Sequence, residues 1–186
     1  VETLLPQSLQ EPDWDAATAF RYRRRGSAQG SLVAVQHIGA MALKDLKEVE
    51  PQKEKIYRNT EQFVRGFPAN NVLLTGARGT GKSSLVRACL HAFSGQGLRL
   101  IEVGKAELVD LPDIVDVVAH RPEKFIIFCD DLSFDEGEPG YKALKSVLDG
   151  SVAVASPNVL VYATSNRRHL LPEYMADNLS YTRSAD

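Results

Sequence analysis

A glycine-rich segment of eight residues constrains the fold of this chain more than any other feature. It matches the pattern G-x-x-x-x-G-K-[ST] and consists of Gly76, Ala77, Arg78, Gly79, Thr80, Gly81, Lys82 and Ser83. Residues 71–75 before it form a short apolar run typical of a buried strand. The residues after it, from Ser84 on, place Leu85, Cys89, Leu90 and Phe93 on one face of a helix. A strand, a glycine-rich turn and a helix are the context in which this pattern binds phosphate.

The residue types of this segment indicate what it binds. Glycines let the backbone curve around a phosphate with its N–H groups pointing inward, and the helix N-terminus adds partial positive charge. Lys82 is expected to reach the β- and γ-phosphates, and the Ser83 hydroxyl to bind Mg²⁺. A glycine turn at a helix start can match the pattern by chance, but the flanking strand and helix argue against that interpretation. We therefore predict that residues 76–84 bind a nucleoside triphosphate, with ATP and Mg²⁺ as the cofactors.

Apolar runs on either side of this segment predict the layout of the fold. We expect strands at residues 71–75, 98–103, 125–129 and 159–164, with helices between them. A further helix should start at Pro51, where a missing N–H costs little, and end at Gly66 and Pro68. Strands that alternate with helices predict a three-layer α/β fold with a parallel sheet.

The N-terminal part of the chain is less regular. A helical spacing of apolar residues fits a short helix over residues 14–22, and residues 31–50 hold only short apolar pieces typical of a connecting arm. We therefore divide the chain into an N-terminal arm and linker, residues 1–50, and an α/β nucleotide-binding unit, residues 51–186.

Size and composition narrow the class of protein. A chain of 186 residues fits one domain, and a net charge of −2 argues against a globally basic nucleic-acid binder. No apolar run approaches the ~20 residues of a membrane helix. Cys89 and Cys129 each lie in an apolar run, so we expect reduced core thiols and a cytoplasmic location. The chain opens with Val1 rather than Met, and we expect a piece of a longer protein.

Polar residues follow the third and fourth predicted strands. Asp130 stands where a carboxylate can hold the Mg²⁺ that Ser83 also binds, and Asp131 where one can take a proton from water attacking the γ-phosphate. Acids also cap turns, and that interpretation of Asp131 stays open. The fourth strand leads into Asn166, whose amide is expected to donate to a phosphate oxygen and accept from water, because strand ends line the ligand crevice. A simple turn asparagine is the alternative.

Together these segments resemble an AAA+ ATPase module, with a Walker A motif, a Walker B motif and a sensor 1. More narrowly, the chain resembles an uncharacterised bacterial family of AAA+ ATPases, domain of unknown function 815, over most of its length. The segments that carry the resemblance are residues 59–64, 70–84, 97–103, 130–134 and 162–170. It implies a sheet of the additional-strand, catalytic-acid type, in which a further strand lies between the phosphate-binding and acid-tipped strands. It also implies ATP use and assembly of the full-length protein into a homo-oligomer, but it indicates no substrate.

The chain departs from the resemblance in two respects. AAA+ proteins usually carry Glu where this chain has Asp131, which is one methylene shorter, so the attacking water would have to lie closer. The fold is also expected to be truncated before its fifth strand, arginine finger and helical lid, so this piece alone should hydrolyse ATP very slowly. Arg167 and Arg168 come too early in the chain to supply the finger.

The predicted function is an ATP-binding and ATP-hydrolysing module that couples nucleotide state to remodelling or loading of a macromolecular partner, either protein or nucleic acid. A P-loop kinase acting on a small acceptor and a nucleotide-gated binding module with little hydrolysis are the alternatives. Residues 21–25 form an arginine-rich cluster, which we interpret as a solvated or intersubunit arm, with a nucleic-acid site as the alternative. The four histidines, His37, His91, His120 and His169, show no metal-ligand spacing.

Overall fold

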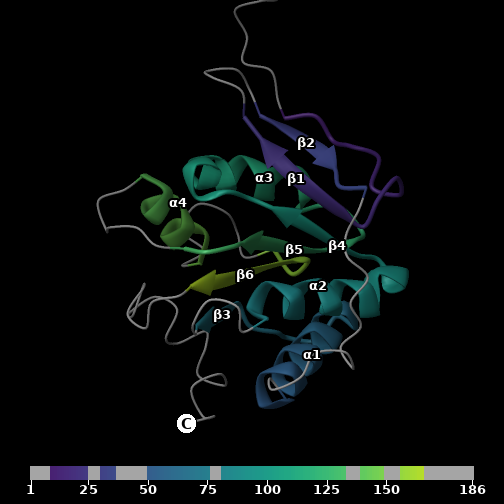
Figure 1. The fold of residues 1–186 in the computed structure, drawn as a ribbon. Coiled ribbons are helices and arrows are strands. Elements are labelled where there is room, and N and C mark those ends of the chain that lie inside the picture. The colour runs from purple at the N-terminus through teal and green to yellow at the C-terminus, as the bar shows by residue number, and fades with distance from the viewer. Residues whose placement is uncertain are drawn as a thin grey trace, which may run out of the picture.

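A computed structural model of the chain describes residues 9–24, 30–36, 50–75, 81–132, 139–148 and 156–165 (Figure 1). The strands are β1 (Ala19–Arg23), β2 (Ser31–Ala34), β3 (Val72–Thr75), β4 (Leu98–Glu102), β5 (Lys124–Cys129) and β6 (Val159–Ser165). The α-helices are α1 (Glu50–Val64), α2 (Lys82–Phe93), α3 (Leu111–Val118) and α4 (Pro139–Leu148). Two 3₁₀ helices, η3 (Ser94–Gln96) and η4 (Lys105–Asp110), precede β4 and α3.

The described strands form one six-stranded sheet in the order β2-β1-β4-β5-β6-β3. Every neighbouring pair is parallel except β1 and β2, which pair antiparallel. β6 lies between β3, which leads into the glycine-rich segment, and β5, which leads into the two acids, so the predicted insertion of a further strand is confirmed. Because β3, β5 and β6 run in the same direction, their carboxyl ends meet at one edge of the sheet.

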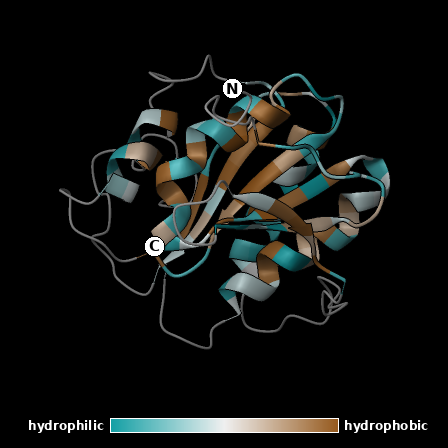
Figure 2. Ribbon diagram, turned by 90° about the horizontal axis from the view of Figure 1, so that it is seen from above, coloured by the Kyte–Doolittle hydropathy of each residue, from teal (hydrophilic) through white to brown (hydrophobic). Residues whose placement is uncertain are grey.

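Helices cover both faces of the sheet and bury a continuous apolar core. α1 packs against α2, whereas α3 and η4 pack against α4 (Figure 1). Phe125 to Cys129 of β5 are all buried, and hydrophobic residues run along the central strands (Figure 2). Cys89 and Cys129 are free and buried, as predicted. The three-layer α/β architecture expected from the sequence is therefore confirmed.

A small polar network joins α1 to the middle of β6. Tyr162 is fully buried, and its hydroxyl lies 2.8 Å from Thr60 Oγ1 and accepts a 3.0 Å hydrogen bond from Asn59 Nδ2. Asn59 also exchanges hydrogen bonds with the backbone of Asn70, just before β3. α1 ends at Val64, and the turn after it holds Gly66, whose φ of 85° lies in the left-handed region that favours glycine.

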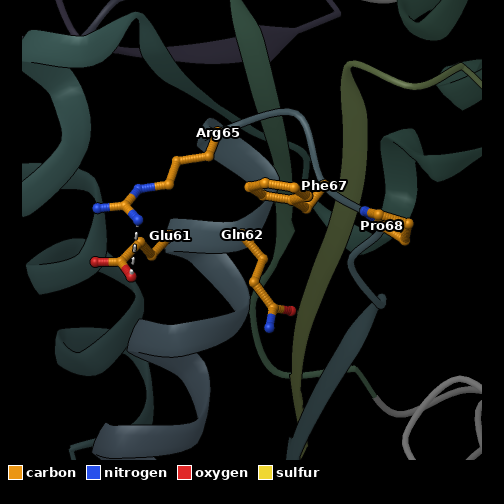
Figure 3. Close-up of a pocket in the computed structure, with 5 residues that line it drawn as sticks. All are labelled: Glu61, Gln62, Arg65, Phe67 and Pro68. Atoms are coloured by element: carbon orange, nitrogen blue, oxygen red, sulfur yellow. Dashed lines mark ion pairs between the residues drawn. The ribbon is translucent and has the colours of Figure 1, made fainter.

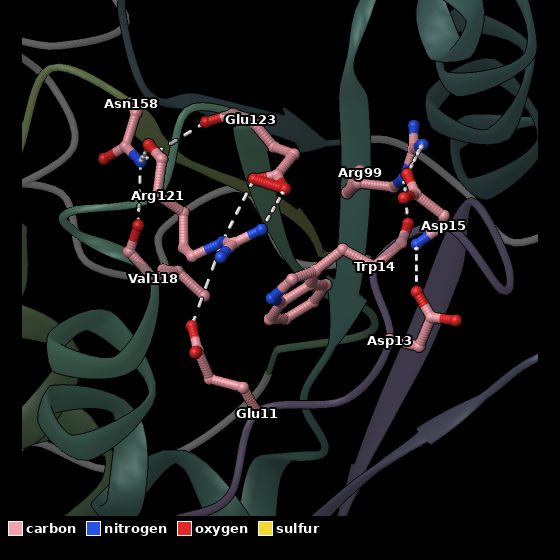
Figure 4. A network of polar contacts seen from close by, with 9 residues as sticks. All are labelled: Glu11, Asp13, Trp14, Asp15, Arg99, Val118, Arg121, Glu123 and Asn158. Atoms are coloured by element: carbon pink, nitrogen blue, oxygen red, sulfur yellow. Dashed lines mark hydrogen bonds and ion pairs between the residues drawn. The ribbon is translucent and has the colours of Figure 1, made fainter.

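The N-terminal segment differs from the prediction. Residues 14–22 do not form a helix: residues 14–18 are turn and bend, and β1 begins at Ala19. Trp14 is buried, with its ring edge-on to Phe20 and Phe125, and its backbone carbonyl accepts a 2.7 Å hydrogen bond from Arg99 Nε (Figure 4). Trp14 and Phe20, two of the apolar residues that suggest a helix, therefore have partners far away in the sequence, Phe125 and Ile101.

β1 and β2 extend the sheet beyond β4. Phe20 and Ile101 are partners in the parallel register of β1 and β4, and Phe20 also faces Ala34 of β2. Residues 31–34, expected to be part of a connecting arm, are thus a strand of the same sheet as β3, β4, β5 and β6. The division of the chain at residue 50 stays an interpretation of the sequence.

The turn between α3 and β5 is held by one side chain. Asn158, buried just before β6, donates from Nδ2 to the carbonyls of Val118 and Arg121 at 2.8 and 2.9 Å (Figure 4). Arg121 in turn forms a 2.7 Å ion pair with Glu123. Together these contacts fix the amino ends of β5 and β6, opposite the edge where the predicted site lies.

Candidate nucleotide-binding site

The register of the sheet brings the predicted acids next to the end of β6. Cys129 of β5 is the partner of Ala163 on β6, so Asp130, one residue further along, lies beside Thr164. On the other side of β6, Thr75 at the end of β3 is the partner of Ser165. Parallel pairing therefore places Thr75, the last residue before the glycine-rich segment, and the two acids on either side of one strand tip.

α2 begins directly after Gly81, the last glycine of the glycine-rich segment. Gly81 has φ 85° and ψ 16°, in the left-handed region that favours glycine, and its carbonyl accepts the N–H of Leu85. Among the described residues no side chain caps this helix, and its first turn holds no acidic residue. An uncapped helix N-terminus with lysine as its first residue favours binding of an anion.

Ser83 and Asp130 meet across the site. The Ser83 hydroxyl donates a 2.7 Å hydrogen bond to Asp130 Oδ1, and both residues are half-buried. Two oxygens at adjacent corners of a magnesium octahedron lie about 2.9 Å apart, because Mg²⁺–oxygen bonds measure about 2.0–2.1 Å. A hydroxyl and a carboxylate at this separation therefore fit a Mg²⁺ ion without a large rearrangement. Asp130 stands where the sequence predicted a metal ligand.

Thr164 organises the turn that carries both acids. Its hydroxyl donates to Asp130 Oδ1 at 2.5 Å and accepts the Asp131 N–H at 2.8 Å. Its carbonyl accepts the N–H of Leu132, also at 2.8 Å. Asp131 has φ 57° and is exposed, so its side chain lies at the surface of the site, whereas Leu132 is buried. The sequence predicts no functional role for Thr164, although the apolar run that ends there indicates the end of a strand.

The predicted site residues are thus brought together where the structure describes them. Lys82, Ser83 and Ser84 are the first three residues of α2, and Asp130 and Asp131 lie at the end of β5. Residues 76–80 and Asn166 lie outside the described residues, so their predicted roles stay predictions.

Two arginines and the tyrosine of the arginine-rich cluster contact acids of this chain. Arg21 pairs with Glu102 at 3.5 Å, and Arg24 with Asp110 at 3.4 Å. Tyr22 donates to Asp110 over 2.6 Å, and its burial, together with that carboxylate, raises the pKa of the phenol far above its usual range. These contacts favour a structural role for the part of the cluster that the structure describes.

Two other features lie away from the site. A surface hollow beside the C-terminal end of α1 is lined by Glu61, Gln62, Arg65, Phe67 and Pro68 (Figure 3). Phe67 is 61% exposed there. It lies near the amino end of β3, and the predicted nucleotide site lies at the carboxyl ends of the strands. Among the described residues, no group of three or more histidines, cysteines and acids is arranged to hold a metal ion, and none of the described helices is both long and apolar enough to cross a membrane.

The strand order, with β6 inserted between β3 and β5, and the glycine-initiated helix after β3 are the arrangement expected of a P-loop fold with an additional strand. Known structures agree at the level of the fold. The chain resembles Caenorhabditis elegans PCH-2 with a TM-score of 0.54 and 19% identity, over 75% of this chain and 42% of that one. The family model described as "Protein of unknown function (DUF815)" matches residues 15–185, and the chain belongs to this family.

Two further solved structures share the fold. The Aeropyrum pernix ORC1 protein, in complex with DNA, matches with a TM-score of 0.54 and 18% identity, over 71% of this chain and 43% of its own. AMPPCP-bound DnaA from Aquifex aeolicus matches with a TM-score of 0.52 and 15% identity, over 72% of this chain and 44% of its own. The chain therefore spans less than half the length of each of these proteins. No curated protein sequence matches it.

Proposed function

We propose that this chain is the nucleotide-binding module of an AAA+ ATPase, which binds ATP with Mg²⁺ and hydrolyses it. The observation that carries the proposal is the 2.7 Å contact between Ser83 Oγ and Asp130 Oδ1, next to the uncapped start of α2. These two groups come from segments far apart in the sequence, and they meet at the carboxyl edge where open α/β sheets bind ligands.

Each residue has a distinct task in this proposal. Lys82 and the backbone N–H groups of residues 76–84 hold the phosphates. Ser83 and Asp130 hold Mg²⁺, which neutralises negative charge on the phosphate oxygens when it is bound. Asp131 orients an attacking water and takes up its proton, and Asn166 positions that water. The exposure of Asp131 is consistent with contact to water.

We further propose that the full-length protein assembles with copies of itself and couples its nucleotide state to remodelling or loading of a macromolecular partner. Support comes from the fold it shares with ORC1, whose structure holds DNA, and with DnaA, whose structure holds AMPPCP. Phosphoryl transfer gains about 10³–10⁵-fold in rate from an arginine supplied in cis or in trans. If a neighbouring copy supplies it, the specific ATPase activity of the full-length protein should rise with protein concentration.

Calorimetric titration of ATP, with Mg²⁺ and with EDTA, tests the core of the proposal. The wild-type chain should bind ATP more tightly with Mg²⁺, and Asp130→Asn should lose most of that difference because a metal ligand loses its charge. Asp116→Asn, at an exposed position on α3, is the matched control and should keep it. Equal ATP affinities with and without Mg²⁺ in the wild type would contradict the proposed site.

The fate of the γ-phosphate separates this function from its alternatives. Release of inorganic phosphate supports the ATPase, whereas its transfer to a small acceptor would indicate a kinase. Tight ATP binding without turnover in the full-length protein, with or without DNA, would indicate a nucleotide-gated binding module.

A further inference from the structure

Thr164 forms hydrogen bonds with both acids of the candidate site, Asp130 and Asp131. It lies on β6, is 2% exposed, and contacts three consecutive residues at the end of β5. Its single hydroxyl proton has one destination, Asp130 Oδ1, because the same oxygen already accepts the Asp131 N–H. The Thr164 hydroxyl therefore connects the side chain of Asp130 to the backbone of Asp131 by two hydrogen bonds.

The first of these contacts sets the direction of the metal-binding carboxylate. Asp130 Oδ1 accepts from Thr164 Oγ1 on one side and from Ser83 Oγ on the other. Two donors that approach one carboxylate oxygen from different elements leave the side chain little rotational freedom. Hydrogen bonds to a charged group are also stronger than those between neutral groups. Thr164 thus holds Asp130 toward Ser83.

The second contact sets the backbone of the exposed acid. Asp131 has a left-handed φ of 57°, which is uncommon for a residue other than glycine and is tolerated best by Asp and Asn. The Thr164 hydroxyl and carbonyl accept the N–H groups of Asp131 and Leu132, and so hold the turn on both sides of this residue. The direction in which the Asp131 carboxylate leaves the backbone follows from this conformation.

We propose that Thr164 is a positioning residue of the nucleotide site, which aligns Asp130 for the metal and Asp131 for the attacking water through one hydroxyl. The inference rests on the proposed function, since it assigns a role within the same site. Thr164 touches neither metal nor nucleotide in this scheme and acts only through the two acids. Its side chain therefore links two steps that the acids perform separately, metal binding and water activation.

Thr164→Val tests this directly because it replaces the hydroxyl by a methyl group of similar size and keeps a β-branched strand former. The ATP affinity gained from Mg²⁺ should fall by about tenfold, since one hydrogen bond to a charged group is lost. Amide hydrogen exchange at Asp131 should accelerate. In the full-length protein, kcat should fall more than KM rises, because the Asp131 contact acts on turnover.

Two further variants separate positioning from loss of a buried hydroxyl. Thr164→Ser keeps the hydroxyl and should restore both the Mg²⁺ effect and the slow exchange of the Asp131 amide. Thr60→Val removes another fully buried hydroxyl, bonded to Ile56 O and Tyr162 rather than to the acids, and should leave both readouts unchanged. Thermal melting of each variant without nucleotide defines the temperature at which all are folded.

The outcomes distinguish this inference from the proposed function. A wild-type chain whose ATP affinity does not respond to Mg²⁺ would refute the proposed function and the role of Thr164 with it. A wild type that responds to Mg²⁺, together with a Thr164→Val variant unchanged in both readouts, would overturn only the role of Thr164. Equal losses in Thr164→Ser and Thr164→Val, or in Thr60→Val, would overturn it as well.

Discussion

The Tyr162 hydroxyl lies 2.8 Å from Thr60 Oγ1 and so joins β6 to α1 in the interior of the protein. Thr60 Oγ1 uses its proton to donate to the carbonyl of Ile56. The Tyr162 hydroxyl is therefore the donor in its contact with Thr60 Oγ1, and its oxygen accepts from Asn59 Nδ2. Every hydroxyl proton of this buried network thus has an acceptor. Tyr162 lies in the middle of β6, so the network ties this strand to α1 and contributes to the stability of the fold.

Tyr162→Phe should therefore destabilise the fold without removing apolar contact area. We expect the free energy of unfolding to fall by about 1–2 kcal/mol, because buried hydrogen bonds are lost and Thr60 loses a donor. Urea denaturation measures this change. Tyr57→Phe, on the exposed side of α1, is the matched control and should stay within about 0.5 kcal/mol of wild type. Equal free energies of unfolding of Tyr162→Phe and wild type would show that the Tyr162 hydroxyl contributes nothing to the stability of the fold.

Lys82→Ala should weaken nucleotide binding with little effect on the fold. Removal of the cation at the first position of α2 should cost at least about 1.5–3 kcal/mol of ATP binding free energy, the scale of a hydrogen bond between charged groups. Calorimetry measures it. Lys124→Ala removes the same charge at the opposite end of β5 from Asp130 and should keep wild-type affinity. Unchanged ATP affinity in Lys82→Ala would remove the assignment of residues 76–84.

Asp131→Asn should separate binding from chemistry. The amide keeps the size of the side chain but cannot take up a proton, so ATP should still bind with Mg²⁺ while turnover falls. A positioned general base contributes about 10²–10⁴-fold, which sets the expected loss in kcat for the full-length protein. Phosphate release and ATP titration on the same samples measure the two effects. If Asp131→Asn and Asp130→Asn behave identically, the division of roles between the two acids is wrong.

Both thiols should be inert in the folded protein. Cys89 and Cys129 are fully buried, and burial raises the pKa of each thiol to about 12. Because the thiolate is the reactive form, a thiol reagent at pH 8 should label neither residue before the chain unfolds. The same chain in concentrated urea should react rapidly at both positions, which serves as the control. Rapid labelling in native buffer would contradict the buried placement of these residues.

Local sequence patterns predicted the elements that bury continuous apolar surface. Phe125 to Cys129 form a central strand because every position packs against a helix layer, and Leu111 to Val118 form a helix with its apolar face inward. The pattern failed at Ala19 to Arg23. There a helical spacing of apolar residues coincides with a strand whose pairing partner, β4, lies far along the chain. No local periodicity carries that information.

In the candidate site, too, some residues could be predicted from local sequence patterns and others could not. Lys82, Ser83 and Asp130 were predicted because their motifs combine residue type with position at the end of a strand or the start of a helix. The role of Thr164 was not, because it depends on the register that sets Cys129 opposite Ala163. A register is a relation between two strands, and each strand alone gives no sign of it. The contacts of one hydroxyl become visible only when both strands are in place.

The pairing of β3 with β6 also has a consequence for biosynthesis. Among the described strands, β3 pairs only with β6, which the ribosome makes last. β1 with β2 and β4 with β5 can pair earlier, as neighbours in the order of synthesis. The strand that leads into the glycine-rich segment must therefore wait for β6 to be made before it joins the sheet. A nascent chain stopped before β6 would carry β3 unpaired, so the proposed nucleotide site could not form in the early stages of folding.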